Sequence, residues 1–455
     1  MMAYETLQRS RRTFLTTPGF PFRFFVCVAL GALKVGGAAP NEAWGDVQQI
    51  LEDGVKDHVF PGAVAIVGNK DGILFQTAVG SQTYGQKTPL GGESKPLSVE
   101  STVFDMASCT KVLATTSAIS LLFQEAAFGE KGLSTPVSSI LKGFGGQGKE
   151  DISVENCLLH NAAFPPDPTP DFWDPKFGCK GAPLPSSLNF DCSENAFKAV
   201  LGQTLRPGAK VGGAYVYSDI SFITLMYVAG AVALDKKFVT ASDFLPACNV
   251  GGGENLGLHY QCGFEAFVRM HVFSKLGMDS TQFLPQKSEW EDCAPTTIPT
   301  GEPKVVEGVA LQGRVEDGNA YMLGGIAGHA GLFSNALDIN KLMQELMFEN
   351  RVLNKSTVER FIVQHNHSQS SRALGWNTND ITAQPDGGWD ESCGSLSAKT
   401  FTHVGYTGTQ VCGDPEKEVY TILLTARVYN SSNTGNSTGI HSVRKRFNTA
   451  VVDNL

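Results

Sequence analysis

Our interpretation of the sequence starts from FDMASCTK at residues 104–111, which is followed by VLATTSAISLL at residues 112–122. The second run is apolar or small throughout and lacks Gly and Pro, so it predicts a buried helix that ends at Gly129. Ser108 falls in the first turn, and Lys111 lies on the same face one turn later. A hydroxyl beside an amine is a nucleophile beside its activator, and a helix N-terminus favours a developing oxyanion.

This Ser-x-x-Lys spacing is not unique, because Ser139–Lys142 and Ser442–Lys445 repeat it. We interpret those two copies as surface coincidences, since neither begins a comparably apolar helix. Cys109 would point about 100° away from Ser108 around the helix, so we interpret it as a packed small residue rather than the nucleophile.

Composition restricts the class of protein. The chain has 455 residues, of which 42% are hydrophobic and 18% charged, so it is globular and long enough to bury a large core. A net charge of −9 and a pI near 5.5 argue against nucleic acid as a partner. We expect a small-molecule or peptide substrate, and the sequence leaves the oligomeric state open.

Residues 1–39 have the composition of a targeting segment. Several Arg residues precede an apolar run at 24–33, and GGAAP follows at 36–40, which is the pattern of a secretory signal. Ten apolar residues are too few to span a bilayer, which needs about twenty, so we expect no stable membrane span in the mature protein. The sequence predicts a secreted or extracytoplasmic protein, and a mitochondrial presequence is the alternative.

The ten cysteines fit an oxidising compartment. Cys179 with Cys192, Cys248 with Cys262, and Cys393 with Cys412 have separations that suit disulfides, although buried free thiols remain an alternative. No CxxC or His-x-x-x-His spacing suggests zinc, and we expect neither a metal nor a cofactor.

Hydrophobic periodicity places the main elements. It predicts a helix at 44–56, a hairpin of strands at 62–68 and 73–80, strands at 401–411 and 419–426, and a last helix at 442–452 beside the first. The middle is mostly helical, with helices at 220–234, 264–276 and 336–348. Insertions are expected near 164–190 and 235–262, and 164–185 reads as an irregular surface loop that could act as a lid. One antiparallel sheet built from both chain ends and flanked by helices, plus a mostly helical subdomain, defines an α+β fold.

Three short segments resemble one family. Ser108-Cys109-Thr110-Lys111 resembles a Ser-x-x-Lys box, Tyr217-Ser218-Asp219 a Tyr-x-Asn box, and His403-Val404-Gly405 a Lys-Thr-Gly box in its His-x-Gly form. In this order and spacing they resemble the serine β-lactamase and penicillin-binding protein (DD-peptidase) superfamily, nearest its class C-like branch. The resemblance implies a β-lactamase/transpeptidase-like domain over residues 44–452.

The resemblance also implies roles. Ser108 would be acylated, and Lys111 with Tyr217 would move the proton. Placed together in a dry cleft, these two groups should lower each other's pKa, and they should titrate as a unit, so the base is left unassigned. The backbone N–H groups of Ser108 and Tyr406 would form the oxyanion hole.

Two departures from the family pattern concern the remaining site residues. Asp219 stands where Asn is usual and would orient Lys111 through a charge-assisted hydrogen bond. His403 replaces Lys or Arg and, beside Gly405, would offer a hydrogen bond to a substrate carboxylate or carbonyl, with a charge only when protonated. We interpret His329, in the Gly-dense stretch 323–334, as structural.

The sequence therefore predicts a serine hydrolase that forms an acyl-enzyme on Ser108. Its substrate would be an amide or ester, such as a D-alanyl peptide, a β-lactam or a carboxylic ester. The alternative is a catalytically inactive relative that serves as a binding or structural protein.

Overall fold

A six-stranded antiparallel sheet, with strand order β2-β1-β8-β7-β6-β5, forms the centre of the computed structural model. The structure describes residues 44–177, 179, 192–249, 255–296, 311–382, 391–429 and 437–455. The predicted targeting segment at 1–39, most of 178–191 and the glycine-rich 251–253 lie outside the described residues. The described residues belong to one compact unit.

The sheet is built from both ends of the chain, as predicted. The N-terminal hairpin supplies β1 (Gly62–Asn69) and β2 (Gly72–Gly80), and β1 pairs along its length with β8 (Val419–Thr425). The expected single strand at 401–411 is wrong, because the chain turns between β6 (Phe401–Val404) and β7 (Gln410–Asp414). The short β5 (Asn377–Thr378) completes the far edge.

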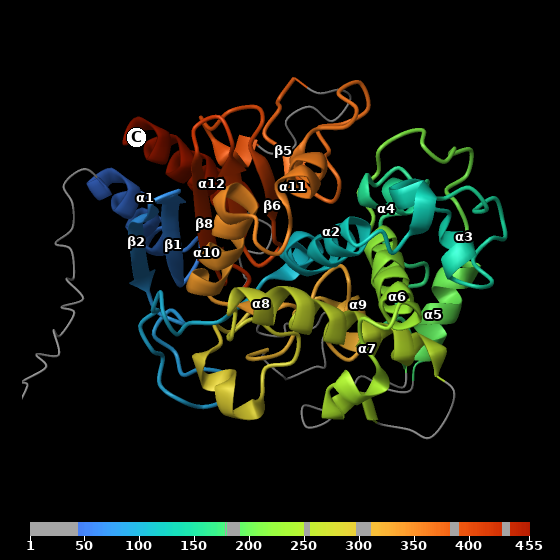
Figure 1. Ribbon diagram of the computed structural model, residues 1–455. Helices are drawn as coiled ribbons and strands as arrows, with labels where there is room; N and C mark the ends of the chain where they lie inside the picture. Colours follow the sequence, from blue (N-terminus) through green and yellow to red (C-terminus); the bar gives the residue numbers. More distant parts are fainter. Residues whose placement is uncertain are drawn as a thin grey trace, which may run out of the picture. The chain divides into compact units, whose positions relative to one another are not determined.

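Two helices cover one face of this sheet. Helix α1 (Gly45–Lys56) lies beside α12 (Ser437–Asp453), as Figure 1 shows at the blue and red ends of the chain. Val47 and Leu51 of α1 and Phe447 and Val451 of α12 are fully buried against each other and the sheet. The predicted packing of the last helix beside the first is confirmed.

The larger core lies on the other face and extends into the helical region. Its central helix is α6 (Asp219–Asp235), in which every residue from Ile220 to Ala233 is buried. It packs closely against α7 (Leu256–Val268). A Cβ on Gly230 of α6 would clash with the carbonyl oxygen of Tyr260 in α7, so glycine is needed at this position. The other α-helices of the described residues are α2 (Ser117–Gln124), α3 (Val137–Ile140), α4 (Val154–Leu158), α5 (Ser193–Gly202), α8 (Ser274–Leu276), α9 (Gly318–Met322), α10 (Ala336–Gln344) and α11 (Lys355–Ile362).

Three expectations for this region need correction. The helix after Ser108 ends at Gln124, before Gly129. The helix predicted at 264–276 begins earlier, at Leu256, because the Asn255 side chain caps it by accepting a hydrogen bond from the N–H of Leu258. The predicted surface loop is partly internal, since Phe164 and Phe172 are each only 1% exposed.

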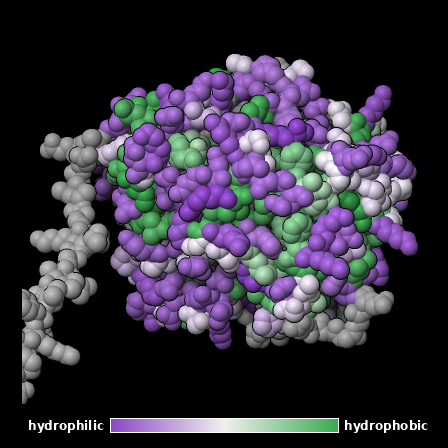
Figure 2. Space-filling model, viewed as in Figure 1, coloured by the Kyte–Doolittle hydropathy of each residue, from purple (hydrophilic) through white to green (hydrophobic). Residues whose placement is uncertain are grey.

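The disulfides join the cysteine pairs that the sequence separations suggest. Disulfides join Cys179 to Cys192, Cys248 to Cys262 and Cys393 to Cys412, so the three predicted pairs are confirmed. Hydrophilic side chains cover most of the face shown in Figure 2. In the part of the chain that the structure describes, no helix has the length and apolar character needed to cross a bilayer.

Candidate active site

The backbone turn that presents Ser108 is held from two sides. Ala107, just before Ser108, has a φ of 45°, a conformation that costs a non-glycine residue energy and persists only where its surroundings enforce it. The Ala107 N–H donates to Oδ1 of Asp105 at 2.8 Å, and Oδ2 of Asp105 accepts from the N–H of Glu316 at 2.7 Å. Burial raises the pKa of Asp105 to about 7, although these two N–H groups oppose the rise. Asp105 therefore fixes the turn that carries the candidate nucleophile.

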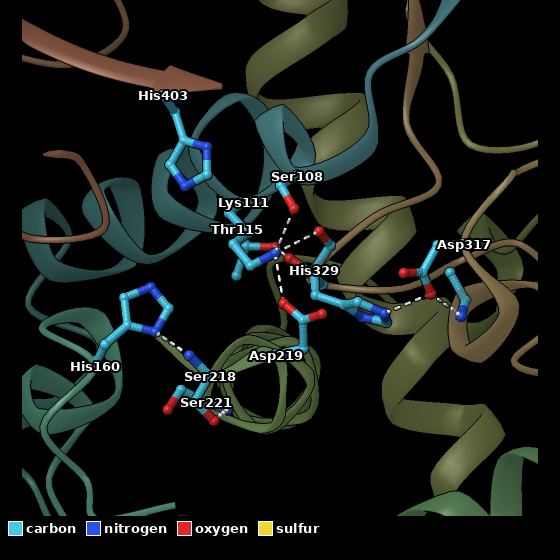
Figure 3. A network of polar contacts seen from close by, with 12 residues as sticks. Ser108, Lys111, Thr115, His160, Ser218, Asp219, Ser221, Asp317, His329 and His403 are labelled. Atoms are coloured by element: carbon cyan, nitrogen blue, oxygen red, sulfur yellow. Dashed lines mark hydrogen bonds and ion pairs between the residues drawn. The ribbon is translucent and has the colours of Figure 1, made fainter. Parts of the chain in front are cut away.

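Lys111 is completely buried and connects the predicted site residues. Its Nζ donates to Ser108 Oγ at 3.0 Å and to the His329 carbonyl oxygen at 3.0 Å, and it pairs with Asp219 Oδ1 at 2.7 Å, as the dashed lines in Figure 3 show. The carboxylate of Asp219 lies close enough to stabilise the positive charge of the ammonium group. The arrangement holds Lys111 in its charged form.

The expected mutual lowering of the Lys111 and Tyr217 pKa values is wrong. Burial lowers the pKa of Lys111, but the charges of Asp219 and Tyr217 outweigh it and leave that pKa above its usual value. Burial raises the pKa of Tyr217, and Asp219 adds to the rise, while Lys111 and Ser108 oppose it. For Lys111 the physical reason is the negative charge of Asp219, which stabilises the ammonium, whereas for Tyr217 burial is the main cause and the Asp219 charge adds to it.

The position of Tyr217 depends on His160, which lies outside the three motifs. Ser218 caps α6, and its backbone N–H donates to Nδ1 of His160 at 3.0 Å. The His160 ring stacks on the Tyr217 ring with centroids 4.7 Å apart and planes 29° apart. The Ser218 hydroxyl donates to the Pro165 carbonyl oxygen at 2.7 Å. The motif at 217–219 is thus held by one segment, residues 160–165, that lies more than fifty positions before it in sequence.

His403, at 4% exposed, is buried and uncharged. Its Nδ1 lies 2.9 Å from the Val404 carbonyl oxygen, so Nδ1 carries the proton, and Nε2 has no hydrogen-bond partner among the described residues. Burial, followed by the charges of Arg372 and Lys111, moves the pKa of His403 well below its usual value. His403 can therefore accept or relay a hydrogen bond, but it does not replace the charge of Lys or Arg.

Gly405 lies against the turn that carries Ser108. A Cβ at this position would come within 2.6 Å of the Met106 carbonyl oxygen and 3.3 Å of the Ala107 Cβ. The residues after Gly405 also contact the segment that precedes Ser108, because the Thr407 hydroxyl donates to the Asp105 carbonyl oxygen at 2.8 Å. The glycine of the third motif thus allows β6 to approach the nucleophile.

We expect Gly405→Ala to slow acylation of Ser108 by about 10- to 100-fold, because a displacement of about 1 Å in a reacting group has an effect of this size. Stopped-flow labelling with a fluorophosphonate would measure the rate. Gly146→Ala is the matched control, since a Cβ there meets nothing within 4 Å. Equal rates for Gly405→Ala and the wild type would contradict this role for the close approach.

A cleft of about 280 Å3 opens onto Ser108. Its lining includes Tyr217, His403, Gly405 and Tyr406. Lys111 and Asp219 lie behind this lining, where the Lys111 amine contacts both Ser108 Oγ and the Asp219 carboxylate. The cleft also contains residues outside the three motifs, and no sequence signal identifies them: Arg372, Asn377, Arg427, Ile440, His441 and Arg444.

One group of side chains has the composition of a metal site. Ligand atoms of Asp219, Asp317 and His329 lie within 4.8 Å of one another. His329 is fully buried with Nε2 3.0 Å from Asp317 Oδ1, in agreement with its predicted structural role. Asp219 already forms an ion pair with the Lys111 ammonium, and that positive charge would repel a metal cation bound at this position. The electrostatics of the group therefore disfavour a metal.

Comparison with known proteins agrees with this geometry. The Beta-lactamase family matches residues 47–445, so the chain belongs to that family. A protein of Escherichia coli (strain K12) named "Putative D-alanyl-D-alanine carboxypeptidase" is 27% identical over 348 residues, which are 71% of this chain and 68% of the relative.

Two solved structures show the same fold. The octameric penicillin-binding protein homologue from Pyrococcus abyssi has a TM-score of 0.59 and 17% identity, over 90% of this chain and 77% of its own. The class C beta lactamase from Rhodobacter sphaeroides has a TM-score of 0.57 and 14% identity, over 90% of this chain and 99% of its own. The predicted α+β, β-lactamase/transpeptidase-like fold is confirmed.

Proposed function

We propose that this protein is a serine hydrolase that forms an acyl-enzyme on Ser108 with an amide or ester substrate. The observation that carries the proposal is the buried Lys111 amine, which contacts Ser108 Oγ and Asp219 and lies 4.9 Å from the centre of the Tyr217 ring. Family membership supports hydrolysis in general. A D-alanyl peptide is the first substrate to test, in view of the name of the Escherichia coli relative.

In the proposed reaction, Tyr217 is the base. The charge of Asp219 favours the protonated Lys111, which therefore acts as a fixed positive charge that opposes the rise in the Tyr217 pKa and favours its phenolate. Ser108 Oγ bonds to the substrate carbonyl carbon while its proton passes to Tyr217. Tyr217 then donates that proton to the departing nitrogen or oxygen, and the bond from that atom to the carbonyl carbon breaks. The backbone N–H groups of Ser108 and Tyr406 stabilise the oxyanion.

Deacylation repeats the same steps with water. Tyr217 takes a proton from a water molecule, whose oxygen bonds to the acyl carbon. The bond between that carbon and Ser108 Oγ breaks, and the proton returns to Oγ. The net reaction adds one water molecule to the amide or ester and leaves the protein unchanged.

The acylation rate should rise with pH as Tyr217 loses its proton. Because the Asp219 charge raises the Tyr217 pKa, we expect Asp219→Asn to shift the midpoint of this rise to lower pH. Fluorophosphonate labelling rates from about pH 7 to about pH 12 would measure the midpoint, because the Tyr217 pKa lies above the usual tyrosine value of about 10. Asp71→Asn, at an exposed carboxylate, is the control. A midpoint that stays in place or moves to higher pH in Asp219→Asn would contradict the assignment of Tyr217 as the base.

The proposal is tested first on the wild-type protein. A fluorophosphonate probe should label it once per chain, and peptide mass spectrometry should place the adduct on Ser108. No labelling of the folded protein would favour the alternative, an inactive binding or structural protein. Hydrolysis rates for a D-Ala-D-Ala peptide, a chromogenic β-lactam and p-nitrophenyl butyrate would then separate peptidase, β-lactamase and esterase activity.

We also propose that the protein matures in an oxidising, extracytoplasmic compartment. The three disulfides support this, because such bonds form and persist mainly outside reducing compartments. N-terminal sequencing of the protein purified from a secreting host should find a cleaved chain that begins near residues 36–40. An uncleaved chain retained in the cytosol would contradict this proposal.

A further inference from the structure

The loop that follows α11 contains a motif that the proposed hydrolase reaction does not use. Residues 366–368 read Asn-His-Ser, which is the Asn-x-Ser acceptor motif for N-linked glycans. The same motif begins at Asn354, Asn430 and Asn436, and the last two of these positions lie outside the described residues. A tripeptide of this kind recurs by chance, so the folded surroundings have to distinguish one copy from another.

Asn366 has the exposure and the local geometry of an acceptor. All three residues of its motif are exposed. The chain turns here, because the backbone N–H groups of Gln369 and Ser370 donate to the Asn366 carbonyl oxygen at 2.9 and 3.0 Å. The Ser368 hydroxyl donates to Asn366 Oδ1 at 2.8 Å. Among the described residues, no hydrogen bond involves Asn366 Nδ2, which is the atom that a glycan modifies.

Two strongly exposed apolar side chains lie close to this turn. Val363, three positions before the motif, is 59% exposed, and Ile381 is 55% exposed. His367 Nε2 lies 3.0 Å from Thr382 Oγ1 and 3.2 Å from Asp380 Oδ2, and these two residues are the sequence neighbours of that isoleucine. Neighbouring exposed apolar groups promote association between molecules unless something covers them.

We propose that Asn366 carries an N-linked glycan, which also covers Val363 and Ile381 and so opposes self-association. The co-reactant is an oligosaccharide that is linked to a lipid through pyrophosphate. Asn366 Nδ2 bonds to the anomeric carbon of the sugar, and the bond from that carbon to the pyrophosphate oxygen breaks with its electron pair on the oxygen. The amide releases one proton to solvent. This inference rests on the proposed extracytoplasmic maturation, because the transfer takes place outside the cytosol.

The other described copy of the motif fits this role less well. Asn354 is exposed too, but its Oδ1 caps α11 by accepting the Thr357 N–H at 2.9 Å, and its own N–H donates to Gln124 Oε1 at 2.7 Å. A glycan on a side chain fixed in this way has fewer orientations available, which costs conformational entropy. Only Ser368 holds the Asn366 side chain, so we expect Asn366 to be occupied more fully than Asn354.

Site-specific mass spectrometry of the full chain, purified from a secreting eukaryotic host, tests the proposal. Peptide N-glycosidase in heavy-oxygen water converts a glycan-bearing Asn into a mass-labelled Asp, so each motif is measured separately. We expect most copies of the protein to carry the label at Asn366. Asn366→Gln and Ser368→Ala should each remove it, and Ser368→Thr should keep it, because threonine also supplies the hydroxyl. Ser356→Ala, which destroys the motif at Asn354, is the matched control and should leave the occupancy of Asn366 unchanged.

The covering of the apolar side chains has its own test, which is light scattering by concentrated protein during storage. Asn366→Gln should aggregate faster than the wild type. Adding Val363→Ser and Ile381→Ser to that variant should restore the wild-type rate, because the uncovered apolar surface is then gone. Equal aggregation of the wild type and Asn366→Gln would overturn this part of the proposal.

The outcomes separate the glycan from the two proposals made above. If the chain is secreted and cleaved near residues 36–40 but Asn366 is unmodified, the glycan is overturned and extracytoplasmic maturation stands, whichever other motif is modified. An uncleaved chain retained in the cytosol overturns both. Fluorophosphonate labelling of Ser108 should be equal in Asn366→Gln and the wild type, so the hydrolase function is judged independently.

Discussion

Ser108→Ala is expected to abolish covalent labelling and to reduce hydrolysis of every substrate by about 10⁴-fold or more. The variant removes the oxygen that would carry the acyl group and leaves no hydroxyl to replace it at the end of the Lys111 amine. The half-buried Ser108 side chain contributes little to the core, so the melting temperature should stay close to that of the wild type.

The two other copies of the spacing provide matched controls. Ser139 donates its hydroxyl to the Pro136 carbonyl oxygen at 2.7 Å, and Ser442 is exposed on α12. Ser139→Ala and Ser442→Ala should label at the wild-type rate. If Ser108→Ala is still labelled while Ser139→Ala or Ser442→Ala is not, Ser108 is not the nucleophile.

Lys111→Met is expected to reduce acylation by about 10³-fold, because it removes the fixed positive charge that favours the Tyr217 phenolate, and also to destabilise the protein. Asp219 would remain as an unpaired charge beside the core, since its side chain is only 16% exposed. Breaking a buried ion pair from one side costs about 3–5 kcal/mol. Urea denaturation would measure the stability, and Lys355→Ala, in an exposed pair with Glu359, is the control.

A double variant separates the two consequences of losing Lys111. Lys111→Met/Asp219→Asn removes both charges, so most of the lost stability should return while acylation stays slow. Recovery of acylation in the double variant would contradict a catalytic role for the Lys111 charge. Failure to recover stability would show that the ion pair is not the source of the loss.

Local sequence patterns predicted most of the fold. The helical spacing at 44–56, the turn at 69–72 and the apolar run of α6 each specify an element through local chemistry. The turn between β6 and β7 combines local and tertiary contacts, since within it the Gly408 N–H donates to the Gly405 carbonyl oxygen at 3.0 Å. The Thr409 hydroxyl donates to the Met106 carbonyl oxygen at 3.0 Å, across 303 positions of sequence, and no local pattern encodes that contact.

The candidate site was predictable only where its motifs are contiguous. The structure brings Ser108, Lys111 and Tyr217 together, which the three motifs led us to expect. His160 and Arg372 lie outside the motifs and reach Tyr217 only through the folded chain. The sequence predicts that Asp219 contacts Lys111 and favours its ammonium, but whether that charge outweighs burial depends on their 2.7 Å contact, which only the folded chain shows.

The pairing of β1 with β8 has a consequence for biosynthesis. Ala63 lies opposite Thr425, and β8 joins β1 to β7 in the strand order, so β1 has only its hairpin partner until the last tenth of the chain has left the ribosome. Contacts of such long range are slow to form and leave strand edges unprotected meanwhile. A nascent chain stalled before residue 419 should therefore be protease-sensitive and should bind chaperones, even though the whole segment bearing Ser108 has already been synthesised.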